Sequence, residues 1–212
     1  MRNVIPGLLV AAALIFTALV YPSLPESMVT HWGMDGTPDG HSSRAFGAWL
    51  IPAVMFGVWL IMRVLPKIDP RRENYARFAG TYTTLITVVI AFMGLMHVAI
   101  LGVALGWPIA VPRVIPFAVG AMFVIIGNLL PRARPNWFVG IRTPWTLSSD
   151  RVWERTHRLG GVLFVASGLV MIAATFGPPW LLGPAIGVAF VLGGLIPVLY
   201  SLVLWMRERK TE

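Results

Sequence analysis

Two histidines and two aspartates lie within one short stretch of the chain, where they could bind a metal or another ligand. They are His31, Asp35, Asp39 and His41. Imidazole nitrogens and carboxylate oxygens suit zinc and similar divalent cations. The spacing matches no standard metal signature, and Asp-Gly and Pro-Asp-Gly are also favoured in tight turns. The stretch therefore predicts either a turn or a ligand site, with Trp32 beside it at the level of the lipid headgroups.

A second segment, residues 127–158, places arginines beside aromatic rings. Arg142 and Trp145 flank Thr143-Pro144, and the residue before a proline favours extended backbone. A cation and an aromatic ring would thus be displayed together on a stiff stretch, as binding of a partner protein or a lipid phosphate requires. The alternative is that these residues only anchor the chain at the membrane interface. The candidate binding residues are Asn128, Pro131, Asn136, Gly140, Arg142, Thr143, Pro144, Trp145, Trp153 and His157.

The end of this second segment predicts a short helix. Ser148 is a favoured N-cap residue, and Asp150 suits a first helical turn. Val152, Trp153 and Thr156 would then share one face of the helix. We expect that helix to lie on the membrane or to pack under the rest of the protein.

The composition indicates which elements position these residues. Charged residues are 12% and apolar residues 57% of the 212, whereas a soluble domain has about 25% and 45–50%. A bilayer core is crossed by about 20 apolar residues per helix. Six stretches of roughly this length predict an all-α, polytopic transmembrane bundle, with the first stretch retained and not cleaved as a signal peptide. They are residues 4–21, 46–62, 78–107, 114–130, 159–176 and 180–206.

The spans divide the chain into three expected parts. Residues 1–66 form a two-helix membrane segment that contains the His/Asp loop. Residues 67–111 contain the third transmembrane helix and its connections. Residues 112–212 form a C-terminal membrane domain that contains the second motif segment.

The positive charges predict the orientation of the bundle. If the spans alternate, 15 of the 17 Lys and Arg residues fall on one side, and Arg44 and Arg113 fall on the other. Because short cytoplasmic loops are rich in Lys and Arg, both termini and the second segment are expected in the cytoplasm, and the His/Asp loop outside. Anionic lipid headgroups account for this charge better than direct nucleic-acid binding does.

Several classes of site are missing from the sequence. The chain contains no cysteine, so disulfides and thiol chemistry are excluded. It also has no phosphate-binding glycine loop, no His-Glu-x-x-His helix, no nucleophile elbow and no acidic pair inside a span. These absences argue against an enzyme or an energy-coupled transporter. The only cofactor that the residues suggest is a divalent metal at the His/Asp loop.

Two features inside the spans predict helix packing. His97 shares a helix face with Thr83, Thr87 and Gly94, which favours a hydrogen-bonded packing residue over a proton relay. Gly183 and Gly187 form a small-xxx-small pair in the last span. We expect this pair to be a packing seam within one chain or between the chains of a homo-oligomer.

The second segment closely resembles the SdpI family of bacterial membrane proteins. The resemblance lies in Gly127-Asn128, Pro131, Pro135-Asn136-Trp137-Phe138, the run from Gly140 to Ser148, Val152-Trp153 and Thr156-His157. The outer loop, with Leu24-Pro25, His31-Trp32, Gly36 and Pro38-Asp39, is similar to a small membrane domain of unknown function that often precedes it. Together the two cover most of the chain.

The resemblance implies a function in the bacterial cytoplasmic membrane. It implies immunity against a secreted peptide toxin outside the cell, or signalling through a regulatory protein, such as a repressor, held at the inner face. The alternative is a metal-dependent membrane enzyme or a small-molecule transporter that uses His31, Asp35, Asp39 and His41.

Overall fold

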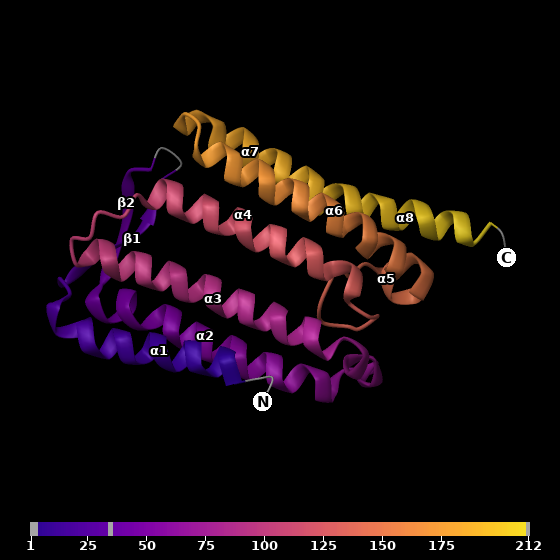
Figure 1. Cartoon of the computed structure of the whole chain (residues 1–212), viewed down its shortest axis with the longest axis horizontal. Helices are drawn as coiled ribbons and strands as arrows, with labels where there is room; N and C mark the ends of the chain where they lie inside the picture. Colours follow the sequence, from indigo (N-terminus) through magenta and orange to yellow (C-terminus); the bar gives the residue numbers. More distant parts are fainter. Residues whose placement is uncertain (1–3, 34–35, 211–212) are drawn as a thin grey trace.

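The computed structural model of the protein describes residues 4–33 and 36–210. Within them, six helical segments are long and apolar enough to cross a membrane: residues 4–23, 44–68, 72–104, 111–132, 150–175 and 179–208. The predicted polytopic helical bundle is therefore confirmed. The six segments pack side by side as an elongated bundle, with α3 and α4 adjacent at its centre (Figure 1).

The first half is a three-helix group. It contains α1 (Val4–Val20), a short 3-10 turn η1 (Tyr21–Ser23), α2 (Arg44–Ile68), a second 3-10 turn η2 (Arg72–Phe78) and α3 (Ala79–Ala104). Val10 of α1, Met55 of α2 and Ile90 of α3 are buried together between the three helices. The contact between these three residues holds α3 in place, and the second half of the chain packs against α3.

His97 joins α3 to α1 inside this group. Its side chain is fully buried, and Nε2 lies 2.7 Å from the Thr17 hydroxyl oxygen. The Thr17 hydroxyl also donates to the carbonyl of Ala13, one turn earlier. Thr87 is similarly bonded to the carbonyl of Thr83 in its own helix. The expectation that His97 is a hydrogen-bonded packing residue agrees with this geometry.

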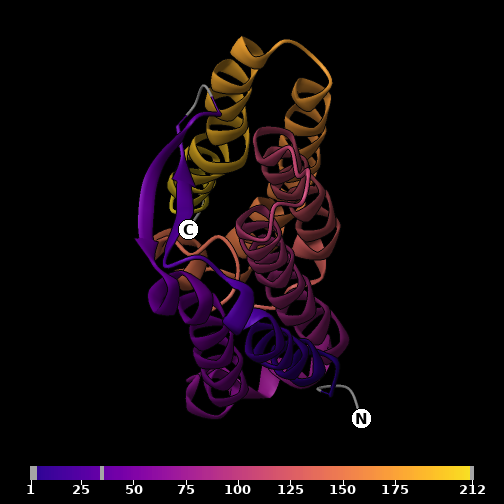
Figure 2. The same ribbon diagram turned by 90° about the vertical axis from the view of Figure 1, so that its left-hand side faces the viewer.

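The His/Asp loop, expected to form a turn or a ligand site, folds into a β-hairpin. Strands β1 (Ser27–Trp32) and β2 (Pro38–Ser43) pair antiparallel, from Ser27 opposite Ser43 to Trp32 opposite Pro38, with irregular register near His31. Leu24 and Met28 are buried against Ala48 of α2 and Leu101 of α3, which seats the hairpin on the first half. Its strands extend from there toward α7 in the second half (Figure 2).

The second half contains α4 (Val111–Leu129), the 3-10 turn η3 (Leu130–Arg132), α5 (Pro144–Ser148) and α6 (Asp150–Thr175). The last span follows a 3-10 turn, η4 (Pro179–Leu181), and consists of α7 (Leu182–Phe190), a π-helical turn η5 (Val191–Leu195) and α8 (Ile196–Glu208). The three parts of this span run on as one rod across the bundle (Figure 1).

Two pairs of glycines bring α4 and α6 into backbone contact. An added Cβ on Gly120 would lie 2.7 Å from the carbonyl oxygen of Gly168, and one on Gly127 would lie 2.6 Å from that of Gly161. The glycines are seven residues apart on each helix, so both pairs lie on one seam. Small residues that let backbones approach closely are the usual basis of helix packing in membranes.

Two sequence predictions about the second half need correction. An added Cβ on Gly187 would meet nothing within 4 Å, so Gly187 faces open space and contributes no seam within the chain. In addition, Ser149 and not Ser148 is the N-cap: its hydroxyl accepts from the N–H of Val152. The helix that it caps is not a short separate one, because it continues from Asp150 to Thr175 as the fifth span.

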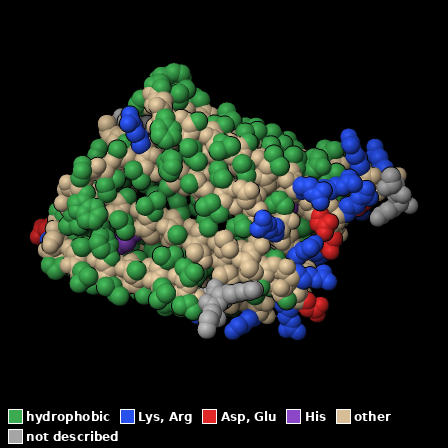
Figure 3. Space-filling model, in the orientation of Figure 1, with side chains coloured by type: hydrophobic (Ala, Val, Ile, Leu, Met, Phe, Trp, Pro, Cys, Tyr) green, Lys and Arg blue, Asp and Glu red, His purple; other side chains and the backbone are tan. Residues whose placement is uncertain are grey.

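The surface separates charge from apolar residues. Lys and Arg side chains gather at the end of the bundle where α2 ends and α6 begins, whereas apolar side chains cover the sides (Figure 3). Large apolar residues such as Leu19, Val162 and Phe190 are more than half exposed. In a bilayer these side chains contact lipid. We refer below to the arginine end and, at the opposite side, the hairpin end.

The glycine seam predicts how single methyl groups affect stability. Gly120→Ala should lower the free energy of unfolding by about 1–3 kcal/mol, because overpacking forces the α4 and α6 backbones apart. Gly187→Ala is the matched control and should not destabilise the protein. The measurement is denaturant unfolding in detergent, followed by tryptophan fluorescence. Equal stability of the two variants would contradict the seam.

Candidate functional site

The hairpin end brings two of the predicted site residues together. Nδ1 of His31 in β1 lies 2.5 Å from a carboxylate oxygen of Asp39 in β2, and both side chains are exposed. The strand pairing positions them, because Gly40, opposite His31, leaves room above the His31 ring. This pair forms a polar rim that points away from the bundle.

A groove of about 400 Å³ lies beneath this rim. His31 and Trp32 of the hairpin cover it, and helices α3, α4 and α7 supply apolar walls. The groove therefore lies where the two halves of the protein meet under the hairpin. Its helix residues include Met96, Ile100, Ile115, Pro116, Leu182 and Ile186.

The metal prediction gains little from the geometry. Among the described residues, no three His, Asp or Glu side chains lie close enough together to hold an ion. His31 and Asp39 are adjacent, whereas His41 is placed two residues along β2, opposite Val29. Asp35, the fourth predicted ligand, lies outside the described residues. The described part of the loop thus offers one His–Asp pair.

At the arginine end, Asp69 holds two loops together. It follows α2 and is 2% exposed. Its carboxylate accepts hydrogen bonds from the N–H of Arg71 at 2.7 Å, the hydroxyl of Tyr75 at 2.9 Å and the N–H of Trp137 at 2.9 Å. A buried carboxylate needs such donors to compensate for lost water. Trp137 belongs to the second motif segment, so Asp69 joins the two connections of this end.

Asn136 shapes the backbone of the motif segment from within. Its side chain is fully buried. The amide oxygen accepts from the N–H groups of Phe138 and Val139 at 2.9 and 2.7 Å, and the amide nitrogen donates to the carbonyls of Arg134 and Val139. All four bonds are local, so Asn136 folds residues 134–139 into a closed turn.

His157 and Trp153 anchor the same loop to α6. The N–H of Ile141 donates to Nε2 of His157 at 3.0 Å, so the proton of the neutral ring is on Nδ1, which donates to the Trp153 carbonyl. The two rings stack at 4.0 Å, and Trp153 Nε1 donates to the Ala133 carbonyl. Gly140, at φ +117°, passes so close to the imidazole that no side chain fits there.

Thr143 starts α5 and ties it to the last span. Its hydroxyl accepts from the N–H of Thr146, and the Thr146 hydroxyl accepts from the N–H of Thr143, forming a capping box. The Thr143 hydroxyl also lies 3.1 Å from that of Ser201 in α8. Trp145 therefore lies in a short helix and not in the predicted extended segment.

The remaining candidates of this segment lie at the surface. Arg142 is exposed and donates to the Trp137 carbonyl at 3.1 Å, and the Trp137 side chain is 48% exposed. The indole and the guanidinium thus belong to one short surface loop. Asn128, Pro131 and Pro144 are also exposed. The arrangement offers an aromatic ring and a cation on a backbone that buried residues hold in place.

The comparisons with known proteins follow the same division of the chain. Residues 132–203 match the SdpI/YfhL protein family, and residues 8–56 match a domain of unknown function (DUF1648). We refer to residues 132–203, which this family model matches, as the SdpI/YfhL domain. The immunity protein SdpI of Bacillus subtilis (strain 168) is 25% identical over 175 residues, which are 82% of each chain. No solved structure matches the chain.

The SdpI/YfhL domain depends on residues outside it that the sequence analysis did not select. Asp69 and Tyr75 support its loop, Asn74 donates to the Pro135 carbonyl, and Arg71 pairs with Asp150 at 2.6 Å. The one available signal was an aspartate between prolines in an otherwise basic connection, Pro66 to Pro70. That pattern does not reveal which distant loop the carboxylate serves.

The Asp69 contacts predict that the SdpI/YfhL loop loosens when this carboxylate is removed. Asp69→Ala leaves the N–H groups of Arg71 and Trp137 and the Tyr75 hydroxyl without their acceptor, at about 1–3 kcal/mol. We expect faster trypsin cleavage after Arg134 and Arg142.

The control for this experiment is Glu73→Ala. Glu73 is an exposed acid on the same connection, and it has no hydrogen bond or ion pair with the described residues. Its removal should leave the cleavage rate unchanged. If both variants are cleaved at the wild-type rate, Asp69 does not hold the loop.

Proposed function

We propose that this chain is an immunity protein of the bacterial cytoplasmic membrane that protects the cell from a secreted antimicrobial peptide. The proposal is supported by the similarity to the immunity protein SdpI and by the SdpI/YfhL domain. The observation that carries it is the placement of the two motif-bearing loops at opposite ends of one membrane bundle. One end can meet a peptide while the other meets a protein in the cell.

In this proposal, the arginine end faces the cytoplasm. Basic residues of short loops remain on the cytoplasmic side of bacterial membranes. The clustering of Lys and Arg at one end of the bundle supports this orientation (Figure 3). The hairpin then stands on the outer surface, where a secreted peptide arrives first.

The groove under the hairpin is the proposed site for the peptide. A membrane-active peptide presents apolar side chains, and the groove offers about 400 Å³ between apolar walls. Trp32 supplies a large ring at its roof, and aromatic residues in such pockets dominate binding energies. His31 and Asp39 on the rim provide polar partners for the peptide backbone.

The loop around Trp137 and Arg142 is the proposed site for a regulatory protein inside the cell. Several exposed arginines lie along the start of α6 and the end of α8, among them Arg151, Arg155 and Arg207. Such a surface favours an acidic partner face through charge complementarity. A repressor held there would be kept away from its target, which gives the protein a route to signal.

The proposed orientation can be tested by cysteine labelling, because the chain has no cysteine of its own. Ser23→Cys, at the hairpin end, should react with a membrane-impermeant maleimide in intact cells. Ser148→Cys, at the arginine end, should react only after the cells are permeabilised. Both serines are exposed, so burial does not explain a difference. The reverse pattern would place the hairpin inside the cell and refute the proposed peptide site.

The immunity function predicts survival of a sensitive bacterium. Cells that express the wild-type chain should survive a secreted antimicrobial peptide better than cells with an empty vector. Trp32→Ala should reduce the protective effect by about tenfold in peptide concentration, as the loss of one aromatic anchor in an interface does.

Trp180→Ala is the matched control for Trp32→Ala. Trp180 lies in η4 at the same end of the bundle, is 70% exposed and does not line the groove. Its variant should protect like the wild type, at equal amounts of protein in the membrane. Equal losses in both variants would contradict the groove as the peptide site. No protection by the wild type against a panel of such peptides would contradict the proposed function.

A further inference from the structure

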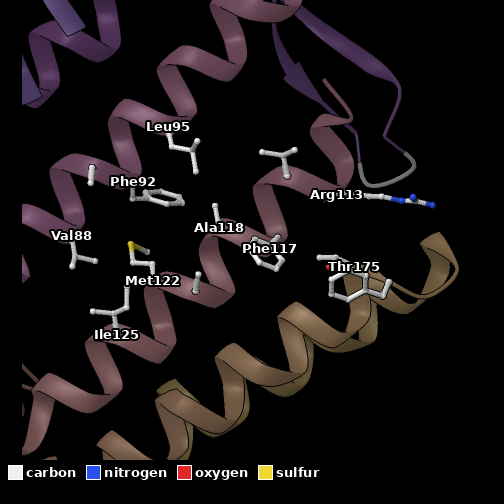
Figure 4. Close-up of a pocket in the computed structure, with 13 residues that line it drawn as sticks. Val88, Phe92, Leu95, Arg113, Phe117, Ala118, Met122, Ile125 and Thr175 are labelled. Atoms are coloured by element: carbon white, nitrogen blue, oxygen red, sulfur yellow. The ribbon is translucent and has the colours of Figure 1, made fainter. Parts of the chain in front are cut away.

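A second and larger groove opens on the side of the bundle and begins near the hairpin end. It has a volume of about 640 Å³ and lies between α3 and α4, next to the end of α6 (Figure 4). Val88, Phe92 and Leu95 of α3 face Phe117, Met122 and Ile125 of α4 across it. Apart from Arg113 and Thr175, its lining side chains are apolar, and the Thr175 hydroxyl already donates to the Ile172 carbonyl.

Arg113 lies at the hairpin end of this groove. Its guanidinium makes no hydrogen bond or ion pair with any residue that the structure describes. The other cation on this side, Arg44, packs against the ring of Tyr21 at 5.9 Å. Arg113 differs from Arg44 in that its side chain is exposed and lines the groove, so it is available to an anion there.

The position of Arg113 in its helix also favours an anion. It is the third residue of α4, where the helix dipole is positive. A cation at that position opposes the dipole, so helix stability gives no reason for it. A bound anion would compensate both the guanidinium charge and the helix end.

The length of the groove matches one leaflet of a bilayer. Its lining residues run along α4 from Arg113 to Ile125, and these twelve steps of 1.5 Å span about 18 Å. Half of a hydrocarbon core is about 15 Å. The groove thus places a cation at headgroup level and an apolar channel along one acyl chain below it.

We propose that this groove binds an anionic phospholipid of the leaflet at the hairpin end. The phosphate lies against the guanidinium of Arg113, and one acyl chain lies between Phe92 and Phe117 and continues past Met122 toward Ile125. A net negative headgroup is favoured over a zwitterionic one, since the described residues that line the groove include no carboxylate to accept a lipid ammonium. The proposal depends on the protein being embedded in a membrane but not on the immunity function.

Native mass spectrometry of the detergent-solubilised full chain tests this site. The probes are phosphatidylglycerol and phosphatidylcholine with identical acyl chains, added separately. Arg113→Gln should lower the retention of phosphatidylglycerol about fivefold, as expected for one cation near an anionic headgroup. Phosphatidylcholine retention should change much less. Arg209→Gln, which removes an exposed cation from the arginine end, should leave both unchanged.

A second variant tests the acyl channel. Ala91 is an exposed residue of α3 that lines the groove, so Ala91→Phe should fill it and lower the retention of both lipids. Ala53→Phe, at an exposed position of α2 outside the groove, is its control. Melting temperatures show whether the variants are folded.

Three results would overturn the proposal. Equal retention of phosphatidylglycerol by Arg113→Gln and Arg209→Gln would rule out the phosphate contact. Equal lipid retention by Ala91→Phe and Ala53→Phe would rule out the acyl channel. This result is expected if the groove holds an apolar peptide segment instead. Equal loss of both lipids in Arg113→Gln would show that headgroup charge plays no part. Since no toxin is used, failure here leaves the proposed immunity function untouched.

Discussion

The absence of hydrogen-bond partners in hydrocarbon is the constraint on which this structure depends. Within the spans, every backbone polar group has to be satisfied by the protein itself. Several polar side chains are also bonded there, although Nδ1 of His97 has no partner among the described residues. Thr17, Thr87 and Ser167 each donate to the carbonyl four residues earlier in their own helices, and His97 meets Thr17. The residues able to contact soluble partners are therefore displaced to the two ends. The bundle separates the hairpin end from the arginine end by the length of its spans.

The sequence predicts the spans well because length and apolar content are local properties. It misses the hairpin, since the pairing of β1 with β2 is not marked by regular alternation and the register is irregular near His31. It also does not identify the glycine seam between α4 and α6. The seven-residue spacing of Gly120 and Gly127 recurs in Gly161 and Gly168, but only the folded chain shows that these two helices face each other. Which helices meet is a non-local property.

At the arginine end, the sequence identifies the motif segment but does not distinguish its buried residues from its exposed ones. Asn136, Thr143, Trp153 and His157 are polar or aromatic residues of the kind that binds partners, yet they are buried and bonded within the protein. Asn136 and Thr143 meet Tyr75 of η2 and Ser201 of α8, which lie far away in the sequence, whereas Trp153 and His157 bind the backbone of the motif segment. Other side chains of the motif, Trp137 and Arg142 among them, are exposed.

The buried residues form the scaffold of the loop, and the exposed residues form its recognition surface. One helix, α3, links the loop to the other end of the bundle. The N–H of Trp137 binds Asp69 beside η2, which leads directly into α3. At its other end, Leu101 of α3 supports the hairpin through Leu24 and Met28. A signal between the ends would require α3 to have two arrangements. The hydrogen bonds from His97 to Thr17 of α1 and from Tyr82 to the Met62 carbonyl of α2 oppose a shift of α3 relative to these helices.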